Sequence, residues 1–182
     1  MKILSIAIPC YNSAAYMRRC IDSLLSGGED VEILIVDDGS TKDNTAEIAD
    51  EYEKNYPGIV KAIHQENGGH GAAVNAGLKA ATGIYFKVVD SDDWVNIGDF
   101  IEFVKRLKEE TADAVICDYR KEHVYNGKSE YFEYKDLEDG KKYNLNEIGL
   151  NILHGEYFMM ATTTYRTEAV SYTHLTLPTK LE

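Results

Sequence analysis

Short apolar segments alternate with helical patterns over the first 118 residues, and this alternation limits the folds open to the chain. Strands are predicted at Leu4–Pro9, Val31–Val36, Ile59–His64, Tyr85–Val89 and Ala114–Asp118. Helices are predicted between them, at about Ser13–Leu25, Asn44 or Thr45 to Tyr56, Ala72–Ala81 and Ile97–Glu110. Strands that alternate with helices form right-handed βαβ units. The chain is therefore predicted to be an α/β protein whose mostly parallel sheet is flanked by helices.

Polar turns follow three of the predicted strands. These turns are Tyr11-Asn12, Asp37–Ser40 and Asp90–Asp92. In an open α/β sheet, ligands bind in the crevice beyond the carboxyl ends of the strands. Because the three turns share one edge of a parallel sheet, we expect them to line a single ligand site.

Asp90, Asp92 and Asp93 lie within four residues at the end of an apolar run. Carboxylates so close repel one another unless a positive charge lies between them. Mg²⁺ and Mn²⁺ take oxygen ligands and often join carboxylates to substrate phosphates. We therefore expect Asp92 to bind a divalent metal, with Asp90 near the same metal or a ribose. The alternative is a strand end whose acids stabilise the N-terminus of the following helix.

Other polar or aromatic positions could also contact a nucleotide or its acceptor. Asp38 follows a buried strand, where a carboxylate can accept a hydrogen bond from a base or ribose, or simply belong to a turn. The loop Asn67–Gly71 precedes a helix N-terminus, which is a potential anion site. Val74 replaces the third glycine of GxGxxG, so a dinucleotide fingerprint is excluded. His70 could contact phosphate or be incidental, and Trp94 could form an acceptor floor or simply pack.

Composition narrows the class of protein. A net charge of −12 disfavours nucleic acid as a partner, because surfaces that bind it are normally basic. Cys10, Cys20 and Cys117 are too scattered for a disulfide framework or a CxxC metal site, which is typical of a reducing cytosol. The sequence contains no apolar run long enough to cross a membrane and no room for a signal peptide. A cytoplasmic location is expected.

The pattern changes after residue 118. Residues 119–142 are rich in Lys, Glu and Tyr, and Asn126-Gly127 predicts an antiparallel hairpin between Glu122–Tyr125 and Glu130–Tyr134. Leu145–His154 is predicted to be helical. Residues 170–182 resemble the in-frame translation of a transposon-end sequencing adapter with read-through, so we expect a non-native tail there. The alternative is a genuine threonine-rich tail.

Four motifs resemble those of the family 2 inverting glycosyltransferases, which have the GT-A fold. They are Ser5–Asn12, Ile35–Thr41, Asn67–Gly71 with Asn75–Gly77, and Val89–Asp93. The resemblance implies that residues 1–118 form a nucleotide-sugar-binding core. The donor-binding residues that it implies are Pro9, Tyr11, Asp38, Gly69, Asn75 and Asp90. Of these, Pro9 and Tyr11 would border the base pocket, and Asp38 would contact the base. Asp92 would ligate Mn²⁺ or Mg²⁺.

The resemblance also implies a reaction, with a role in polysaccharide biosynthesis. A sugar would pass with inversion from a nucleotide diphosphate, a UDP-sugar in the expected case, to a glycan, lipid-linked or other acceptor hydroxyl. The carboxylate base normally follows a segment like Thr164–Glu168, so residues 119–169 are expected to be the incomplete start of an acceptor-side region. We therefore expect a truncated transferase with poor or absent transfer. Any contact with the inner face of the membrane would need segments missing from this chain.

Two other classes of protein fit parts of the pattern. One is a non-catalytic nucleotide-sugar-binding module. The other is a phosphatase-like hydrolase with Asp90 as nucleophile and Asp92 as acid. That chemistry usually places the aspartates on the first strand of the sheet, whereas three βα units precede them here, so we disfavour it.

Overall fold

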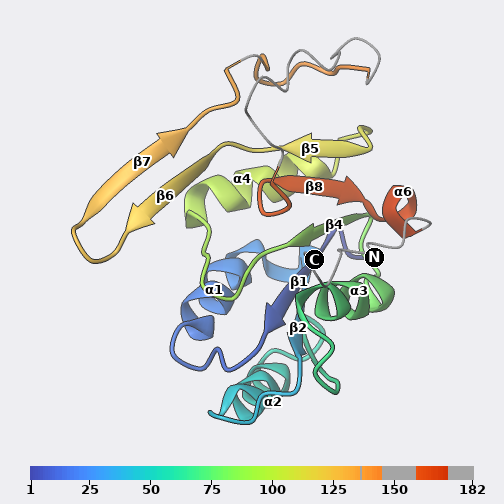
Figure 1. Cartoon of the computed structure of the whole chain (residues 1–182). Helices are drawn as coiled ribbons and strands as arrows, with labels where there is room; N and C mark the ends of the chain where they lie inside the picture. Colours follow the sequence, from blue (N-terminus) through green and yellow to red (C-terminus); the bar gives the residue numbers. More distant parts are fainter. Residues whose placement is uncertain (136, 145–158, 172–182) are drawn as a thin grey trace, which may run out of the picture.

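A computed structural model describes residues 1–135, 137–144 and 159–171 of the chain. Its centre is a six-stranded sheet in the order β3-β2-β1-β4-β8-β5 (Figure 1). The strands are β1 (Leu4–Cys10), β2 (Val31–Asp37), β3 (Val60–His64), β4 (Tyr85–Val88), β5 (Ala114–Ile116) and β8 (Thr163–Arg166). β1 to β4 are mutually parallel, as predicted, so their carboxyl ends share one edge.

The order in which successive strands are added to the sheet reverses between β1 and β4. β2 and β3 lie on one side of β1, and β4 lies on the other. The β1–β4 ladder ends at the pair Ala7 and Val88, whereas the β1–β2 ladder continues to Cys10 and Asp37. The two central strands therefore separate at the carboxyl edge, and such switch points are where open α/β sheets bind ligands.

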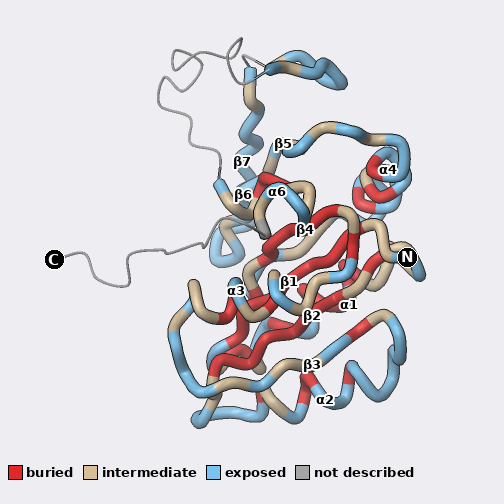
Figure 2. The backbone as a smooth tube through the Cα atoms, turned by 90° about the vertical axis from the view of Figure 1, so that its right-hand side faces the viewer, coloured by how far each residue is buried: buried red, intermediate tan, exposed pale blue. Residues whose placement is uncertain are grey.

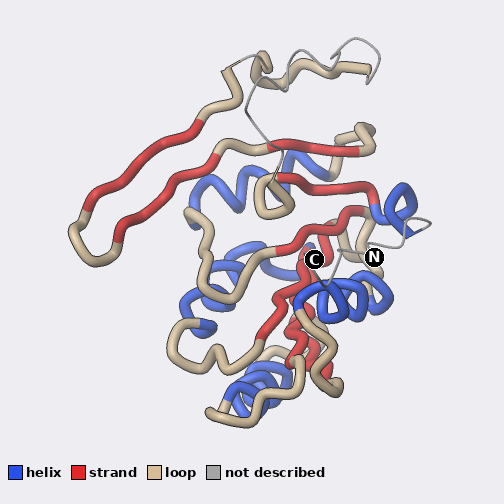
Figure 3. Tube along the Cα trace, in the orientation of Figure 1, coloured by secondary structure: helices blue, strands red, loops and turns tan. Residues whose placement is uncertain are grey.

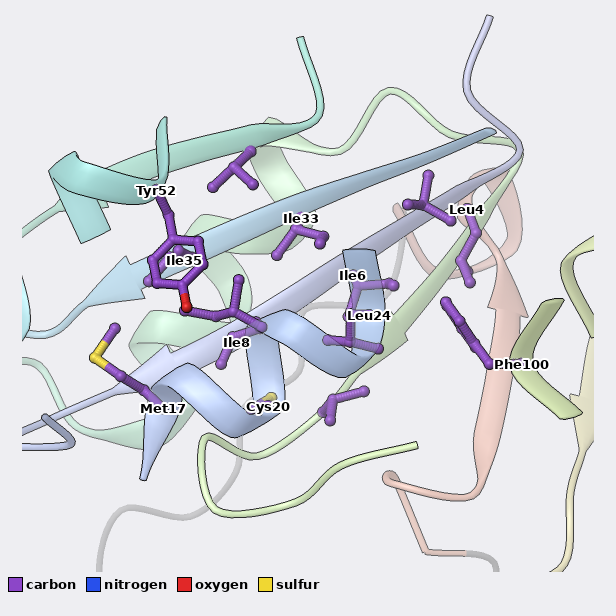
Figure 4. Close-up of a cluster of buried hydrophobic side chains, with 14 of the residues drawn as sticks. Leu4, Ile6, Ile8, Met17, Cys20, Leu24, Ile33, Ile35, Tyr52 and Phe100 are labelled. Atoms are coloured by element: carbon purple, nitrogen blue, oxygen red, sulfur yellow. The ribbon is translucent and has the colours of Figure 1, made fainter. Parts of the chain in front are cut away.

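Helices cover both faces of the sheet. α1 (Met17–Leu24), α2 (Thr45–Asn55) and α4 (Ile97–Leu107) contribute to the larger apolar core, and a 3₁₀ helix, η1 (Leu25–Asp30), follows α1. Figure 2 shows that burial is concentrated in the central strands and the helix faces against them. In Figure 4 the strand side chains Leu4, Ile6, Ile8, Ile33 and Ile35 meet Met17, Cys20, Leu24, Tyr52 and Phe100 from the helices.

α3 (His70–Ala80) covers the opposite face, over β1 and β2. Val74 of this helix is fully buried against a second core cluster with Ala7, Phe86 and Val88. Gly77 allows the close approach, because a Cβ at this position would lie 2.5 Å from the Cβ of Ala7. The helix starts two residues earlier than predicted, which places His70 in its first turn.

The sequence patterns did not predict β8. This short strand inserts antiparallel between β4 and β5, and its first two residues, Thr163 and Thr164, are buried. Its amino end therefore lies at the carboxyl edge of β4, where the N–H of Cys117 donates to the carbonyl of Thr162 at 3.0 Å. β8 brings a segment distant in sequence beside the predicted ligand site.

The predicted hairpin is confirmed, and each of its strands begins and ends two or three residues earlier in the sequence than expected. β6 (Tyr119–His123) and β7 (Lys128–Phe132) form a separate antiparallel pair that projects from the six-stranded sheet (Figure 3). Tyr119 and Phe132 stack across the pair, with ring centroids 4.7 Å apart. The expected helix at 145–154 and most of the expected tail lie outside the described residues, although α6 (Thr167–Ser171) includes the first two tail positions. No helix in the described part of the chain is long and apolar enough to span a bilayer.

Candidate active site

The turn after β1 is joined to the turn after β2 by the side chains of Asn12 and Ser40. The N–H of Asn12 donates to Ser40 Oγ at 2.9 Å. Asn12 Oδ1 accepts from the N–H groups of Thr41 and Lys42 at 3.1 and 3.0 Å. Asn12 has a φ of +52°, a conformation that asparagine tolerates better than most residues. These contacts hold the first two predicted turns against each other.

Ser13 joins the first turn to the aspartate-rich turn. Ser91 Oγ donates to Ser13 Oγ at 3.0 Å, and the N–H of Tyr11 donates to the same oxygen at 3.1 Å. The expected start of a helix at Ser13 is therefore wrong. α1 begins at Met17, because the Ser13 hydroxyl is engaged in the contact between turns. This polar pair is buried at the switch point between β1 and β4.

Asp38 anchors the loop that leads into α3. Its carboxylate is almost fully buried and accepts hydrogen bonds from Gln65 Nε2 at 2.6 Å, the N–H of Gly68 at 2.9 Å and the N–H of Gly69 at 2.8 Å. Gly69 has a φ of +85°, so it supplies a backbone conformation that other residues rarely adopt. Asp38 thus determines where the amino end of α3 lies.

His70 connects the same helix end to the aspartate-rich turn, Asp90–Asp93, which is the predicted metal motif. Its Nε2 donates to Asp90 Oδ1 at 2.9 Å, and both side chains are nearly half exposed. The sequence alone does not distinguish a functional from an incidental role for His70, because its partner is 20 residues away along the chain. The structure therefore brings Asp38 and Asp90 to the two sides of one short segment, Gly68–His70.

The remaining predicted site residues lie around this segment. Pro9 is buried near the end of β1, and the Tyr11 ring beyond it is 48% exposed. Asn75 is exposed on α3, five positions after His70. Val74, by contrast, points into the core and contributes no polar group to the edge. An aromatic ring, two anchored acids and a helix N-terminus thus share the carboxyl edge.

Asp92 and Asp93 are both exposed. Partial burial raises the pKa of Asp93, repulsion from Asp92 and Asp90 raises it further, and Lys87 acts in the opposite direction. In residues 1–135, 137–144 and 159–171, no three His, Cys, Asp or Glu side chains are grouped to hold a metal alone. A metal held by one or two carboxylates, substrate phosphate and water fits Asp92 with Asp90.

Asp37 belongs to a separate set of contacts that supports the turn at the end of β2. His64 Nδ1 contacts Asp37 Oδ2 at 3.2 Å, and Nε2 contacts Asp50 Oδ1 at 3.0 Å. Burial alone would lower the pKa of His64, but the two carboxylates outweigh it and raise the pKa. Asp37 Oδ1 also accepts from the N–H of Ser40. Asp37 therefore supports the turn, while Asp38 faces the loop before α3.

Lys87 is a buried lysine on β4, the strand that leads into the aspartate-rich turn. Its Nζ donates to the carbonyl oxygen of Ala161 at 2.5 Å, so it ties β4 to the segment before β8. Burial lowers the pKa of Lys87 to about 8, although Cys117 and Asp93 act in the opposite direction.

Lys87→Met should remove a pH dependence of stability. Because the folded-state pKa, about 8, lies below the ordinary value of 10.5, the unfolded chain holds the proton more tightly. Wild-type stability should therefore rise between about pH 8 and about pH 10, by at most about 3 kcal/mol. Urea denaturation across this range measures it, with Lys105→Met, at an exposed position on α4, as the control. Equal slopes for wild type and Lys87→Met would contradict the assignment.

The mostly parallel six-stranded sheet, flanked by helices, defines an α/β protein of the GT-A class. The chain resembles the crystal structure of S. aureus TarS residues 1–349 with a TM-score of 0.73 and 27% identity, over 94% of this chain and 48% of that one. The family model for glycosyl transferase family 2 matches residues 5–165. The chain belongs to glycosyltransferase family 2.

Related proteins are longer than this chain. A putative glycosyltransferase of Bacillus subtilis, EpsH, is 41% identical over 127 residues, which cover 69% of this chain and 36% of EpsH. TarS has also been crystallised in complex with UDP-GlcNAc; that structure is 25% identical, with a TM-score of 0.65 over 94% of this chain and 47% of its own. The chain therefore spans about a third of EpsH and about half of TarS residues 1–349.

Proposed function

We propose that this chain is the donor-binding part of a glycosyltransferase that moves a sugar from a UDP-sugar to an acceptor hydroxyl with inversion. The observation that carries the proposal is the convergence of Asp38 and Asp90 on Gly68–His70 at the switch point of the sheet. The TarS complex with UDP-GlcNAc supports a UDP-sugar as donor, since TarS has the same fold.

In this proposal, each predicted site residue at the carboxyl edge of the sheet contacts or orients a part of the donor. Tyr11, beside Pro9, stacks on or borders the base. Asp38 holds the amino end of α3 and retains one lone pair, on Oδ2, for a base N–H, because each carboxylate oxygen can accept two hydrogen bonds and Oδ1 already accepts two. The N–H groups at the start of α3 face the diphosphate, where the helix dipole favours negative charge. Gly69 permits that approach, and Asn75 lies farther along the same helix.

Asp90 and Asp92 would hold a divalent metal, Mn²⁺ or Mg²⁺, together with phosphate oxygens. The metal supplies positive charge that stabilises the departing nucleoside diphosphate. His70 holds Asp90 in place from the side of α3. Residues 119–169 belong to the acceptor side, and no catalytic base is assigned to the described residues.

The thiols support a reducing, cytoplasmic location as part of the proposal. Cys10 and Cys20 are buried and free, and Cys117 is free and partly buried. Burial raises the pKa of the Cys10 thiol to about 12, so it is neutral and serves as packing rather than as a nucleophile.

Asp92→Asn should weaken the Mn²⁺-dependent binding of UDP by at least about 100-fold, since even indirect partners of metal ligands contribute 10–100-fold. Calorimetric titration of UDP, with Mn²⁺ and with a chelator, measures this. The chelator should reduce wild-type affinity to that of the variant. Asp99→Asn, at another exposed aspartate, serves as the matched control. Equal metal-dependent affinity in wild type and Asp92→Asn would contradict the metal assignment.

Transfer itself is tested by incubating UDP-GlcNAc with a full-length version of the protein and an acceptor mixture. Release of UDP that requires both Mn²⁺ and acceptor is the expected result. Tight binding of UDP-GlcNAc without any turnover by the full-length protein would contradict the transferase and indicate a binding module.

A further inference from the structure

An open groove lies beside the metal motif on the face of the sheet opposite α3. Its volume is about 470 Å³, and its walls come from α1 and the segment that links the metal motif to α4. The residues that line it are Arg19, Asp22, Ser23, Trp94, Val95 and Ile97. None of them belongs to the proposed donor site. Trp94 follows Asp92 by two positions, so their Cα atoms are at most about 7 Å apart.

Arg19 provides unused hydrogen-bond donors in this groove. Its guanidinium stacks on Trp94, with Cζ 3.3 Å from the ring centroid. Within the described part of the chain, the Arg19 side chain makes no hydrogen bond or ion pair, whereas the adjacent Arg18 is paired with Glu51 at 2.6 Å. A guanidinium carries five N–H donors in a rigid plane. The ring beneath it fixes that plane, so the donors are available to a ligand at little cost in side-chain entropy.

Asp22 provides an acceptor in the same groove. Its Oδ1 accepts from the Tyr52 hydroxyl at 2.7 Å, which fixes the carboxylate. Ser23 Oγ accepts from the N–H of Val95 at 3.2 Å, which holds the segment after the metal motif against α1. The walls of the groove are thus joined by hydrogen bonds. One positive and one negative side chain leave its lining without net charge.

We propose that this groove binds a neutral sugar unit of the acceptor, an inference that rests on the proposed transferase function. A sugar ring presents hydroxyls that both donate and accept, and an apolar C–H surface. Arg19 and Asp22 match the hydroxyls, while the 56% exposed Ile97 and the part of the Trp94 ring that Arg19 leaves uncovered match the C–H surface. An anion fits less well, because it would meet Asp22 in a chain whose net charge is −12.

Trp94 is the only tryptophan of the chain, so its fluorescence reports on the groove directly. The whole chain is titrated separately with glucose, galactose, mannose and N-acetylglucosamine to about 200 mM, since one ring in an open groove should bind with a millimolar Kd. At least one sugar should change the emission saturably. Arg19→Ala and Asp22→Asn should each raise that Kd by about 3- to 10-fold, as expected for one lost hydrogen bond. Arg18→Ala, outside the groove, should not.

Three results would overturn the inference. These are no saturable change with any of the four sugars, a Kd unaffected by both groove variants, and saturable binding of inorganic phosphate that requires Arg19, which would identify an anion site. Titration of the wild-type chain with UDP distinguishes failure of the proposed sugar groove from failure of the proposed donor site. Sugar binding without UDP binding would contradict the proposed function, whereas UDP binding without sugar binding would contradict the groove alone.

Discussion

Asp38→Ala is expected to lower the free energy of unfolding by about 3 kcal/mol and to abolish measurable UDP binding. The substitution leaves the N–H groups of Gly68 and Gly69 and the amide of Gln65 without their acceptor. Hydrogen bonds to a charged acceptor contribute more than neutral ones, and groups left unpaired in a buried place add their own cost. The amino end of α3 would no longer be held against β2, so a nucleotide would lose its helix N-terminus.

Urea denaturation and UDP calorimetry on the same variant measure both effects. Glu66→Ala is the matched control, because Glu66 is an exposed acid in the same loop, and it should stay within about 0.5 kcal/mol of wild type. A variant at Asp38 that matches this control in stability and still binds UDP would show that the carboxylate does not organise the loop.

Gly77→Val should destabilise the chain by about 3 kcal/mol or more and displace α3 from the sheet. A Cβ here would lie 2.5 Å from the Cβ of Ala7 and 3.6 Å from a methyl group of Val36. Both neighbours sit on central strands whose ladders prevent them from moving away. Since α3 carries Gly69 and His70 at its amino end, the displacement should also weaken UDP binding.

Lys79→Val isolates the packing effect, because it places the same residue at an exposed position of the same helix. It should cost only the few tenths of a kcal/mol by which valine is a poorer helix former. The two urea midpoints are compared directly. Equal midpoints for the two variants would mean that α3 does not approach β1 as closely as the structure indicates.

Local patterns were sufficient to predict most of the architecture. Apolar runs such as Val31–Val36 have the continuous character of buried parallel strands, and glycine and polar clusters mark their ends. Because the strands are parallel, their order along the chain already places Asn12, Asp38 and Asp90 at one edge. The ends of elements were less certain, as Ser13 and His70 illustrate, since hydrogen bonds from distant segments decide them.

Non-local contacts account for what the sequence could not predict. β8 is four residues long and owes its place to pairing with β4 and β5, about 80 and 50 residues earlier along the chain. The loop contacts of Asp38 and the stacking of Arg19 on Trp94 likewise join residues far apart in sequence. Periodicity carries no information on such pairs.

We propose that the turns after β1, β2 and β4 together hold one metal-bridged diphosphate. Paramagnetic broadening of backbone amide NMR signals by Mn²⁺ in the presence of UDP tests it most directly, with Mg²⁺ as the diamagnetic control. Signals of Gly69, His70 and Asp92 should broaden strongly and only when UDP is present, while Glu32 and Gly83 at the opposite edge stay sharp. Broadening centred on Glu32 and Gly83, or broadening indifferent to UDP, would contradict the account.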